Sequence, residues 1–175
     1  MDTAKIGIIL GSASDLPHAR KIGDTLNELG VAFEVTIASA HRTPDDTAAY
    51  ARNARARGLE VIIAVAGLSA ALPGAVAAQT TLPVIGVPVE SGTLLGMDAL
   101  LSTAMMPPGV PVASVGINGS TNAALLAARI IASHDAGLAD RLQAYADKKA
   151  ASVRAARTDE KAFDGLPMAP AEALQ

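Results

Sequence analysis

The sequence predicts a doubly wound α/β domain built on one parallel β-sheet, and three observations lead to this prediction. Short β-branched runs alternate with helical stretches along the 175 residues, an order typical of successive β-α-β units. Polar, glycine-rich loops follow several of these runs, where the carboxyl ends of parallel strands would meet. The length fits a single domain, and no internal repeat divides it.

The first half of the chain contains three expected strands. Residues 5–10 (KIGIIL), 33–38 (FEVTIA) and 61–65 (VIIAV) are rich in the β-branched side chains that favour buried strands. A helix to about Leu29 separates the first two strands, and a helix from Pro44 to about Arg57 separates the next two. Strands and helices of these lengths form one β-α-β-α-β unit.

The second half repeats the alternation and ends in helices. Pro73 can start a helix, because proline is well tolerated at a first helical position. The remaining expected elements are strands 82–87 and 110–115, a helix around 97–105, and closing helices 121–133 and 135–154. We expect residues 1–156 to form the domain and residues 157–175, which mix charge, glycine and proline, to form a tail outside the core.

Composition excludes several function classes. The net charge is −3 and no basic run is present, which argues against nucleic acid as a partner because phosphate binding needs clustered Lys and Arg. The chain has no cysteine, so disulfide and thiolate chemistry are excluded and the cytoplasm is the simplest location. The first residues run directly into an apolar strand, and no signal peptide fits there.

Between residues 61 and 128 only Glu90 and Asp98 are charged. Glycine and proline divide this stretch into pieces of strand and helix length, which argues against a membrane span. A buried sheet covered by largely buried helices explains it better, and a domain of this size cannot bury all those helix faces alone. We therefore expect a homo-oligomer.

The loop after the first strand, residues 11–15, has the sequence Gly-Ser-Ala-Ser-Asp and opens a helix. The hydroxyls of Ser12 and Ser14 beside free helix N-terminal amides suit a phosphate, and Asp15 suits a sugar hydroxyl. The alternative is that Ser14 or Asp15 only caps the helix.

The loop after the second strand, residues 39–44, places His41 and Arg42 at the same end of the sheet. Arginine can pair bidentately with phosphate, and a histidine that titrates near neutrality can transfer a proton. The alternative is that Thr43 caps the next helix and His41 is a solvated loop residue. His18 and His134 are expected to be surface residues.

The loop after the third strand, residues 66–74, is made of small residues that permit close approach to a flat ligand, although tight helix packing would also explain them. No cluster in the sequence has metal-ligand spacing, and neither a phosphate-binding GxxxxGK[ST] motif nor a Ser-His-Asp order stands out.

Taken in order, these motifs resemble the family of 5-(carboxyamino)imidazole ribonucleotide mutase and aminoimidazole ribonucleotide carboxylase, enzymes of purine biosynthesis. The resemblance runs from about residue 5 to residue 142. The motifs that carry it are Gly11-Ser12-x-Ser14-Asp15, Ser39-Ala40-His41-Arg42-Thr43-Pro44, Leu72-Pro73-Gly74, residues 82–89 (LPVIGVPV), Met106-Pro107 and residues 122–128 (NAALLAA).

The resemblance implies a flavodoxin-like three-layer α/β/α sandwich, assembled as an octamer with active sites near subunit contacts. It implies that Ser12 and Asp15 bind the ribonucleotide, that Arg42 holds the phosphate and that His41 transfers the proton. The family reaction uses no metal or cofactor, and in the mutase carbon dioxide leaves the exocyclic nitrogen and is recaptured at the ring carbon. The expected substrate-binding residues are Ser12, Ser14, Asp15, Ser39, Arg42, Gly67, Ser69, Ala70 and Leu72.

The sequence departs from the mutase pattern in the third loop. Residues 68–71 (LSAA) replace the mutase's Gly-Ala-Ala-His, so Ala71 stands where that branch has a histidine. Ser69 and Ala71 agree with the carboxylase branch, whereas residues 42–44 and 82–89 follow the mutase, which we favour. We expect Ser69 to face the substrate's carboxylate or the transient carbon dioxide.

The sequence gives less support to functions of another class. A flavodoxin-like sheet can be a nucleotide-binding or regulatory module, but a receiver needs paired acids after the first strand and a lysine after the fifth, which this sequence lacks. A flavin module would show an aromatic residue in the candidate loops, and none is present. A third alternative is the family's distant relative that carboxylates a nicotinate dinucleotide. That type is expected to carry an additional segment before its first strand, whereas the first expected strand here begins at residue 5.

Overall fold

A five-stranded parallel sheet with the order β2-β1-β3-β4-β5 forms the centre of the computed structural model, which describes residues 3–170 and residue 173. Its strands are β1 (Ile6–Leu10), β2 (Phe33–Ile37), β3 (Val61–Gly67), β4 (Val84–Val89) and β5 (Ala113–Ser114). Each neighbouring pair runs parallel. The predicted fold class, a flavodoxin-like α/β/α sandwich with a parallel sheet, is confirmed.

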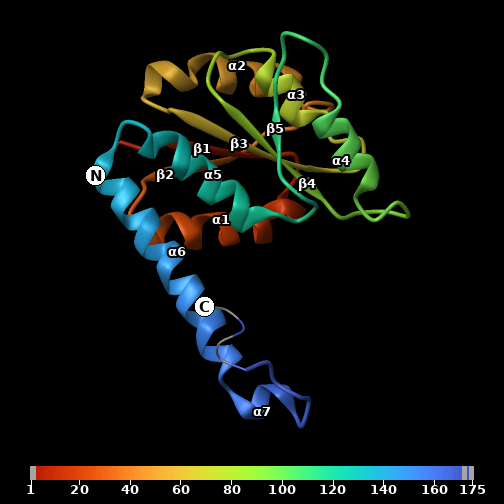
Figure 1. Ribbon diagram of the computed structural model, residues 1–175. Helices are drawn as coiled ribbons and strands as arrows, with labels where there is room; N and C mark the ends of the chain where they lie inside the picture. Colours follow the sequence, from red (N-terminus) through yellow and green to blue (C-terminus); the bar gives the residue numbers. More distant parts are fainter. Residues whose placement is uncertain (1–2, 171–172, 174–175) are drawn as a thin grey trace.

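Helices cover both faces of the sheet (Figure 1). On one face lie α1 (Leu16–Glu28) and α5 (Ser120–Ala132), and on the other lie α2 (Pro44–Ala54), α3 (Leu72–Ala77) and α4 (Met97–Ala104). Strand β1 shows why both layers are needed, since Ile8 and Leu10 pack in the α1–α5 core while Ile9 packs in the opposite core. Side chains alternate across a strand, so a strand that is apolar throughout must be buried on both faces.

The C-terminal part of the chain leaves this sandwich. Helix α6 (Ala136–Arg157) packs against α5 at its start and then projects from the body, and α7 (Glu160–Phe163) lies at its far end (Figure 1). The described residues of the expected tail are 157–170 and 173, and every one is exposed except Phe163, which is half-buried. Residues 171, 172, 174 and 175 of that tail lie outside the described residues.

Two expected strands have the wrong bounds. Strand β4 begins two residues later than expected, because Pro83 has no N–H to donate and Leu82 N–H is bonded to Thr80 Oγ1 at 3.2 Å. Strand β5 pairs only at Ala113 and Ser114 instead of over 110–115. It is an edge strand in which Pro111 lacks a donor, and Val110 N–H turns back to the Pro107 carbonyl at 3.2 Å. The other elements lie where the pattern predicts them, with ends that differ by a few residues.

Strand β4 passes beneath α3 and α4 without room for a side chain at Gly86. A Cβ there would collide with Thr103 Cγ2, and it would lie 3.2 Å from both Pro73 Cβ and Val112 Cγ1. We expect Gly86→Ala to lower the free energy of unfolding by about 1–3 kcal/mol, the usual effect of overpacking a core. Urea denaturation followed by circular dichroism measures it.

The control for this prediction is Gly116→Ala, because a Cβ at Gly116 would meet no atom within 4 Å. We expect that variant to change the free energy of unfolding by less than about 1 kcal/mol. Equal effects of the two substitutions would contradict the packing described for β4.

Candidate active site

The three polar loops predicted from the sequence meet at the carboxyl edge of the sheet. They follow β1, β2 and β3 and surround a pocket of about 690 Å³, a volume suited to a small-molecule ligand. The pocket lies where the chain, after β1, continues to β2 on one side and later to β3 on the other, the usual ligand position in such sheets. All ten predicted site residues line it: Ser12, Ser14, Asp15, Ser39, His41, Arg42, Gly67, Ser69, Ala70 and Leu72.

In the loop after β1, a serine caps the helical turn while the aspartate stays available. Ser12 Oγ accepts a hydrogen bond from Ser14 N–H at 3.3 Å and caps the 3₁₀ turn Ala13–Asp15. Asp15 stands at the N-cap position of α1, but its side chain makes no capping hydrogen bond there. The side chains of Ser14 and Asp15 make no capping hydrogen bond to α1, so the capping alternative is wrong for both, and Ser12 caps only the 3₁₀ turn that precedes the helix.

Asp15 is an acceptor placed in a poorly hydrated position. The residue is 6 % exposed, and its only side-chain hydrogen bond within the described chain is from the Ser14 hydroxyl to Oδ1 at 3.5 Å. Desolvation by burial raises the pKa of Asp15 above its usual value, against the opposing effects of the Ser12 backbone, His18, Ser14 and Arg42. A ligand hydroxyl that donates to this carboxylate would replace part of the lost hydration.

Arg42 joins the loops that follow β1 and β2. Its Nη2 donates to the Gly11 carbonyl at 3.0 Å, and its Nε donates to Ser39 Oγ at 3.4 Å. Thr43 Oγ1 accepts from Ser39 N–H at 2.9 Å and makes no capping bond to α2, so the capping alternative for Thr43 is also wrong. The exposed guanidinium retains N–H groups for an anionic ligand.

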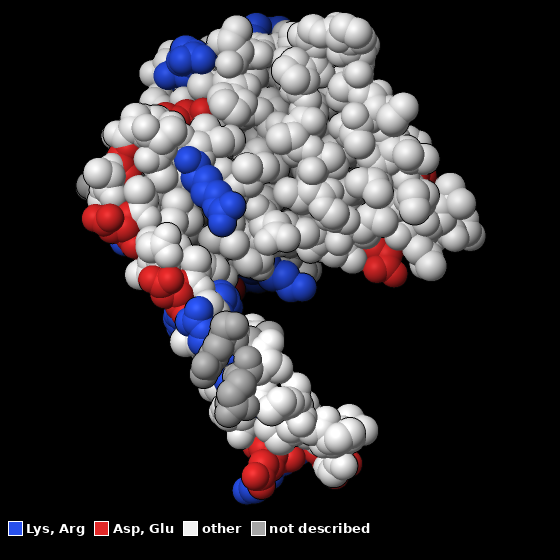
Figure 2. All heavy atoms as spheres, viewed as in Figure 1, with Lys and Arg blue, Asp and Glu red and all other residues white. Residues whose placement is uncertain are grey.

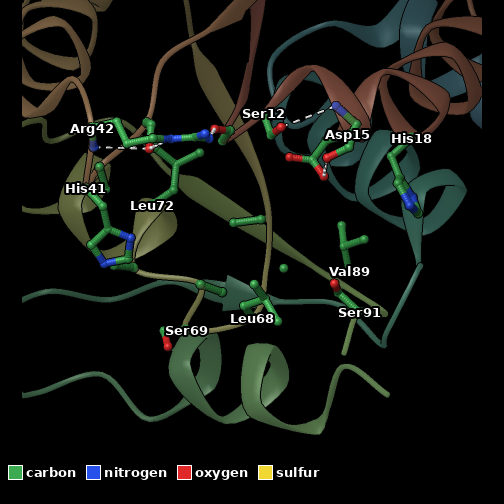
Figure 3. A pocket seen from close by; sticks show the side chains of 18 of the residues that line it. Ser12, Asp15, His18, His41, Arg42, Leu68, Ser69, Leu72, Val89 and Ser91 are labelled. Atoms are coloured by element: carbon green, nitrogen blue, oxygen red, sulfur yellow. Dashed lines mark hydrogen bonds between the residues drawn. The ribbon is translucent and has the colours of Figure 1, made fainter. Parts of the chain in front are cut away.

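His41 lies at one end of the pocket, next to Arg42 and facing the open space (Figure 3). The side chain is exposed, and its ring makes no hydrogen bond to any residue of the described chain. An imidazole free to exchange protons with a ligand is suited to general acid–base chemistry.

The loop after β3 forms the opposite wall, where Leu68 and Ser69 lie across the pocket from Ser12, Asp15 and Arg42 (Figure 3). Ser69 is exposed, while Ala70 and Leu72 are buried and anchor the loop in the core. A Cβ at Gly67 would lie 3.3 Å from the Val89 carbonyl, so packing against β4 also favours a glycine there. Packing therefore accounts for Gly67, and the approach of a flat ligand to the other small residues of this loop stays a prediction.

The prediction that His18 is a surface residue is wrong. His18 is half-buried and lines the pocket, and its Nδ1 lies 3.0 Å from Ser120 Oγ. Desolvation by burial lowers its pKa, and Asp15 acts in the opposite direction. The sequence held a signal for it, because His18 is three residues from Asp15 at the start of the same helix. The prediction for His134 is confirmed, since its side chain is 60 % exposed and pairs with Glu60 at 2.7 Å.

Sequence reasoning also missed the pocket residues that follow β4. Val89, Glu90 and Ser91 line the pocket. Glu90 N–H donates to Asn118 Oδ1 at 3.0 Å, and Asn118 Nδ2 donates to Glu90 Oε2 at 3.1 Å. This reciprocal pair joins the loop after β4 to the loop before α5, with Asn118 in the left-handed region at φ 58°. No local pattern indicates a contact over this separation.

Within residues 3–170, no three His, Cys, Asp or Glu side chains are grouped so that they could hold a metal ion. Among the helices of the described chain, none is long and apolar enough to cross a membrane.

Known proteins are similar to this chain in both sequence and fold. The family model for AIR carboxylase matches residues 5–152. N5-carboxyaminoimidazole ribonucleotide mutase of Thermotoga maritima is 51% identical over 144 residues, which are 82% of this chain and 84% of that protein. The mutase of Bacillus subtilis is 55% identical over 139 residues, 78% of this chain and 86% of that protein.

A second group of relatives has another name. Phosphoribosylaminoimidazole carboxylase of Saccharomyces cerevisiae is 52% identical over 148 residues, covering 85% of this chain but 26% of that longer protein.

Among solved structures, PurE of Treponema denticola superposes with a TM-score of 0.81 at 33% identity, covering 89% of this chain and 98% of the other. The chain therefore belongs to the AIR carboxylase family.

Proposed function

We propose that this protein converts 5-(carboxyamino)imidazole ribonucleotide into 4-carboxy-5-aminoimidazole ribonucleotide in purine biosynthesis. The observation that carries the proposal is the convergence of His41, Arg42 and Asp15 on one pocket in a chain of this family. The relatives named as mutases support it, because they align over most of both chains.

The pocket has a binding group for each part of this ribonucleotide. Arg42 supplies a positive charge for the phosphate through charge-assisted hydrogen bonds. Asp15 would repel a phosphate but accepts hydrogen bonds from sugar hydroxyls, so we assign the ribose to its end of the pocket. Ser12, Ser14 and Ser39 supply further hydroxyls on the same side.

The reaction is balanced without a co-reactant. The bond between the exocyclic nitrogen and the carboxyl carbon breaks, and carbon dioxide is captured by the ring carbon. One proton leaves that carbon and one proton reaches the nitrogen. His41 is the imidazole that we assign to this transfer, and the pocket must orient the ring and exclude water while carbon dioxide is free.

Ser69 is assigned to the carboxyl group, because it lies on the wall opposite Ser12 and Arg42 (Figure 3). A hydroxyl can donate to a carboxylate but brings no positive charge, unlike the histidine that the mutase loop has at the position of Ala71. We expect Ser69→Ala to lower kcat/KM by about three- to tenfold, the effect of losing one neutral hydrogen bond. Steady-state kinetics test this, and unchanged kinetics would remove Ser69 from the site.

A second candidate function, direct carboxylation of aminoimidazole ribonucleotide, is favoured by Ser69 and Ala71 and by the yeast relative named as a carboxylase. A substrate comparison in buffer depleted of carbon dioxide separates the two functions. We expect rapid conversion of the N-carboxylated ribonucleotide there. Turnover of only the uncarboxylated ribonucleotide, and only with added bicarbonate, would establish the carboxylase instead.

We also propose a homo-oligomer, an octamer by resemblance to the family, in the cytoplasm. Figure 2 shows a broad face over β5 and α4 that is almost free of charged side chains. Around α4, the side chains of Leu94, Leu95, Leu101 and Met105 are 61%, 64%, 53% and 78% exposed. An apolar surface of this kind is typical of a subunit contact.

The expected mass in solution follows from this surface. Sedimentation velocity at micromolar concentration is expected to show one species well above a dimer. Replacing Leu94 and Leu95 together by serine should shift the distribution to smaller species. The control is Val153→Ser on the projecting helix α6, because Val153 is similarly exposed, at 66%, and its replacement should leave the distribution unchanged. A stable wild-type monomer would contradict the oligomer.

A further inference from the structure

The proposed function gives no role to His18, although this residue forms part of the pocket wall. Figure 3 shows its ring beside Asp15, at the end of the pocket opposite His41. The chain folds so that one imidazole stands at each end, and only the exposed one, His41, was expected from the sequence.

The orientation of the His18 ring is determined by two helices. Asp15 is the N-cap of α1 and His18 lies in its first turn, so both side chains project from the same end of the helix. From the neighbouring helix α5, Ser120 Oγ lies 3.0 Å from His18 Nδ1. Ser120 is 1% exposed, and α1 packs closely on α5, so the contact is held in place by the core.

This contact determines which ring nitrogen carries the proton. Within residues 3–170, His18 Nδ1 is the only hydrogen-bond partner of the Ser120 side chain. A buried hydroxyl needs an acceptor for its proton, so the Ser120 hydroxyl donates to Nδ1. The proton of the neutral ring is then on Nε2, which makes no hydrogen bond to any residue that the structure describes.

A neutral N–H donor therefore stands beside the Asp15 carboxylate, which is an acceptor. This combination suits a pair of neighbouring hydroxyls, one of which donates to the carboxylate while the other accepts from the ring. It suits an anion poorly, because the carboxylate repels it. The phosphate is accordingly left to Arg42, whose guanidinium lies in the loop after β2.

We propose that His18 is a substrate-binding residue whose Nε2–H donates to one of the two ribose hydroxyls, the other being bound by Asp15. This inference rests on the proposed function, which identifies the ligand as a ribonucleotide, and extends it to a residue that selects the intact ribose. Ser120 acts through His18 as a positioning residue.

The test is isothermal titration calorimetry with 4-carboxy-5-aminoimidazole ribonucleotide and its 2′-deoxy and 3′-deoxy analogues. We expect His18→Val to weaken binding of the ribonucleotide by about three- to tenfold, the effect of one hydrogen bond. In His18→Val, the ratio of the affinity for the ribonucleotide to the affinity for one of the two deoxy analogues should fall by the same factor. His18→Gln, which retains a donor, should lie between the wild type and His18→Val, and His134→Gln should bind like the wild type.

An equal loss of affinity for the ribonucleotide and both analogues would overturn the proposal, since a merely structural role predicts that result. An unchanged affinity in His18→Val would overturn it as well. Circular dichroism confirms the fold of each variant, and His18→Gln provides the comparison if His18→Val does not fold.

Failure of the proposed function gives a different result. If the wild type binds no imidazole ribonucleotide, the same comparison is made by NMR titration with ribose 5-phosphate and 2-deoxy- and 3-deoxyribose 5-phosphate. Discrimination that depends on His18 would then support this inference without the proposed substrate. Equal binding of the three sugar phosphates would contradict it.

Discussion

His41→Asn is expected to lower kcat by about two to four orders of magnitude, the usual contribution of a general acid–base group. Asparagine keeps the size and polarity of the side chain but cannot transfer a proton near neutral pH. Because His41 is exposed and makes no hydrogen bond within the described chain, its replacement leaves no buried partner unsatisfied. We therefore expect folding and ribonucleotide affinity to stay close to those of the wild type.

The measurement is single-turnover conversion of the N-carboxylated ribonucleotide, together with calorimetric binding of the product. His134→Asn is the matched control, because His134 pairs with Glu60 and does not line the pocket. Near-normal turnover by His41→Asn would mean that another group, or the substrate itself, moves the proton.

Arg42→Ala is expected to raise KM by about 10- to 150-fold with a much smaller change in kcat. The estimate corresponds to about 1.5–3 kcal/mol for hydrogen bonds to a charged group. In the proposed function the guanidinium binds the phosphate, which takes no part in bond making or breaking, so its loss should affect the bound ground state and the transition state alike.

Arg42 also connects Gly11 to Ser39, so a structural effect has to be separated from the loss of charge. Arg42→Lys retains the charge without the planar fork and should give an intermediate KM. Arg52→Ala is the control, since Arg52 pairs with Gln79 at 2.8 Å outside the pocket. A fall in kcat at unchanged KM would contradict the phosphate-binding role.

The sequence indicated the position of the site because parallel topology collects the loops. Any segment that follows a strand of such a sheet lies at the carboxyl edge, so the polar residues after β1, β2 and β3 were expected to share one place. Ser12, Arg42 and Ser69 come from three different loops and line one pocket. Their chemical roles remain predictions, and the variants of Arg42 and Ser69 described above test two of them.

Hydrogen-bond partners within the loops could not be read from local patterns. A hydroxyl before a helix can cap it, bind a ligand or close its own loop, and the sequence is the same in all three cases. The structure shows that Ser12 caps the 3₁₀ turn and that Thr43 closes the loop on Ser39, while Asp15 makes no capping bond. These choices depend on backbone conformation, which the residue types restrict only weakly.

By itself, then, the sequence determined the fold class, the order of the strands and helices along the chain, and three of the loops that line the pocket, because each depends on local periodicity and on the connection rules of parallel sheets. Only the tertiary structure decided that β5 pairs over two residues, that Glu90 meets Asn118, and that His18 joins the pocket. His18 and Ser120 are 102 positions apart in the chain. Their contact exists because α1 and α5 pack on the same face of the sheet, and the packing of distant helices leaves no periodic signal in the sequence.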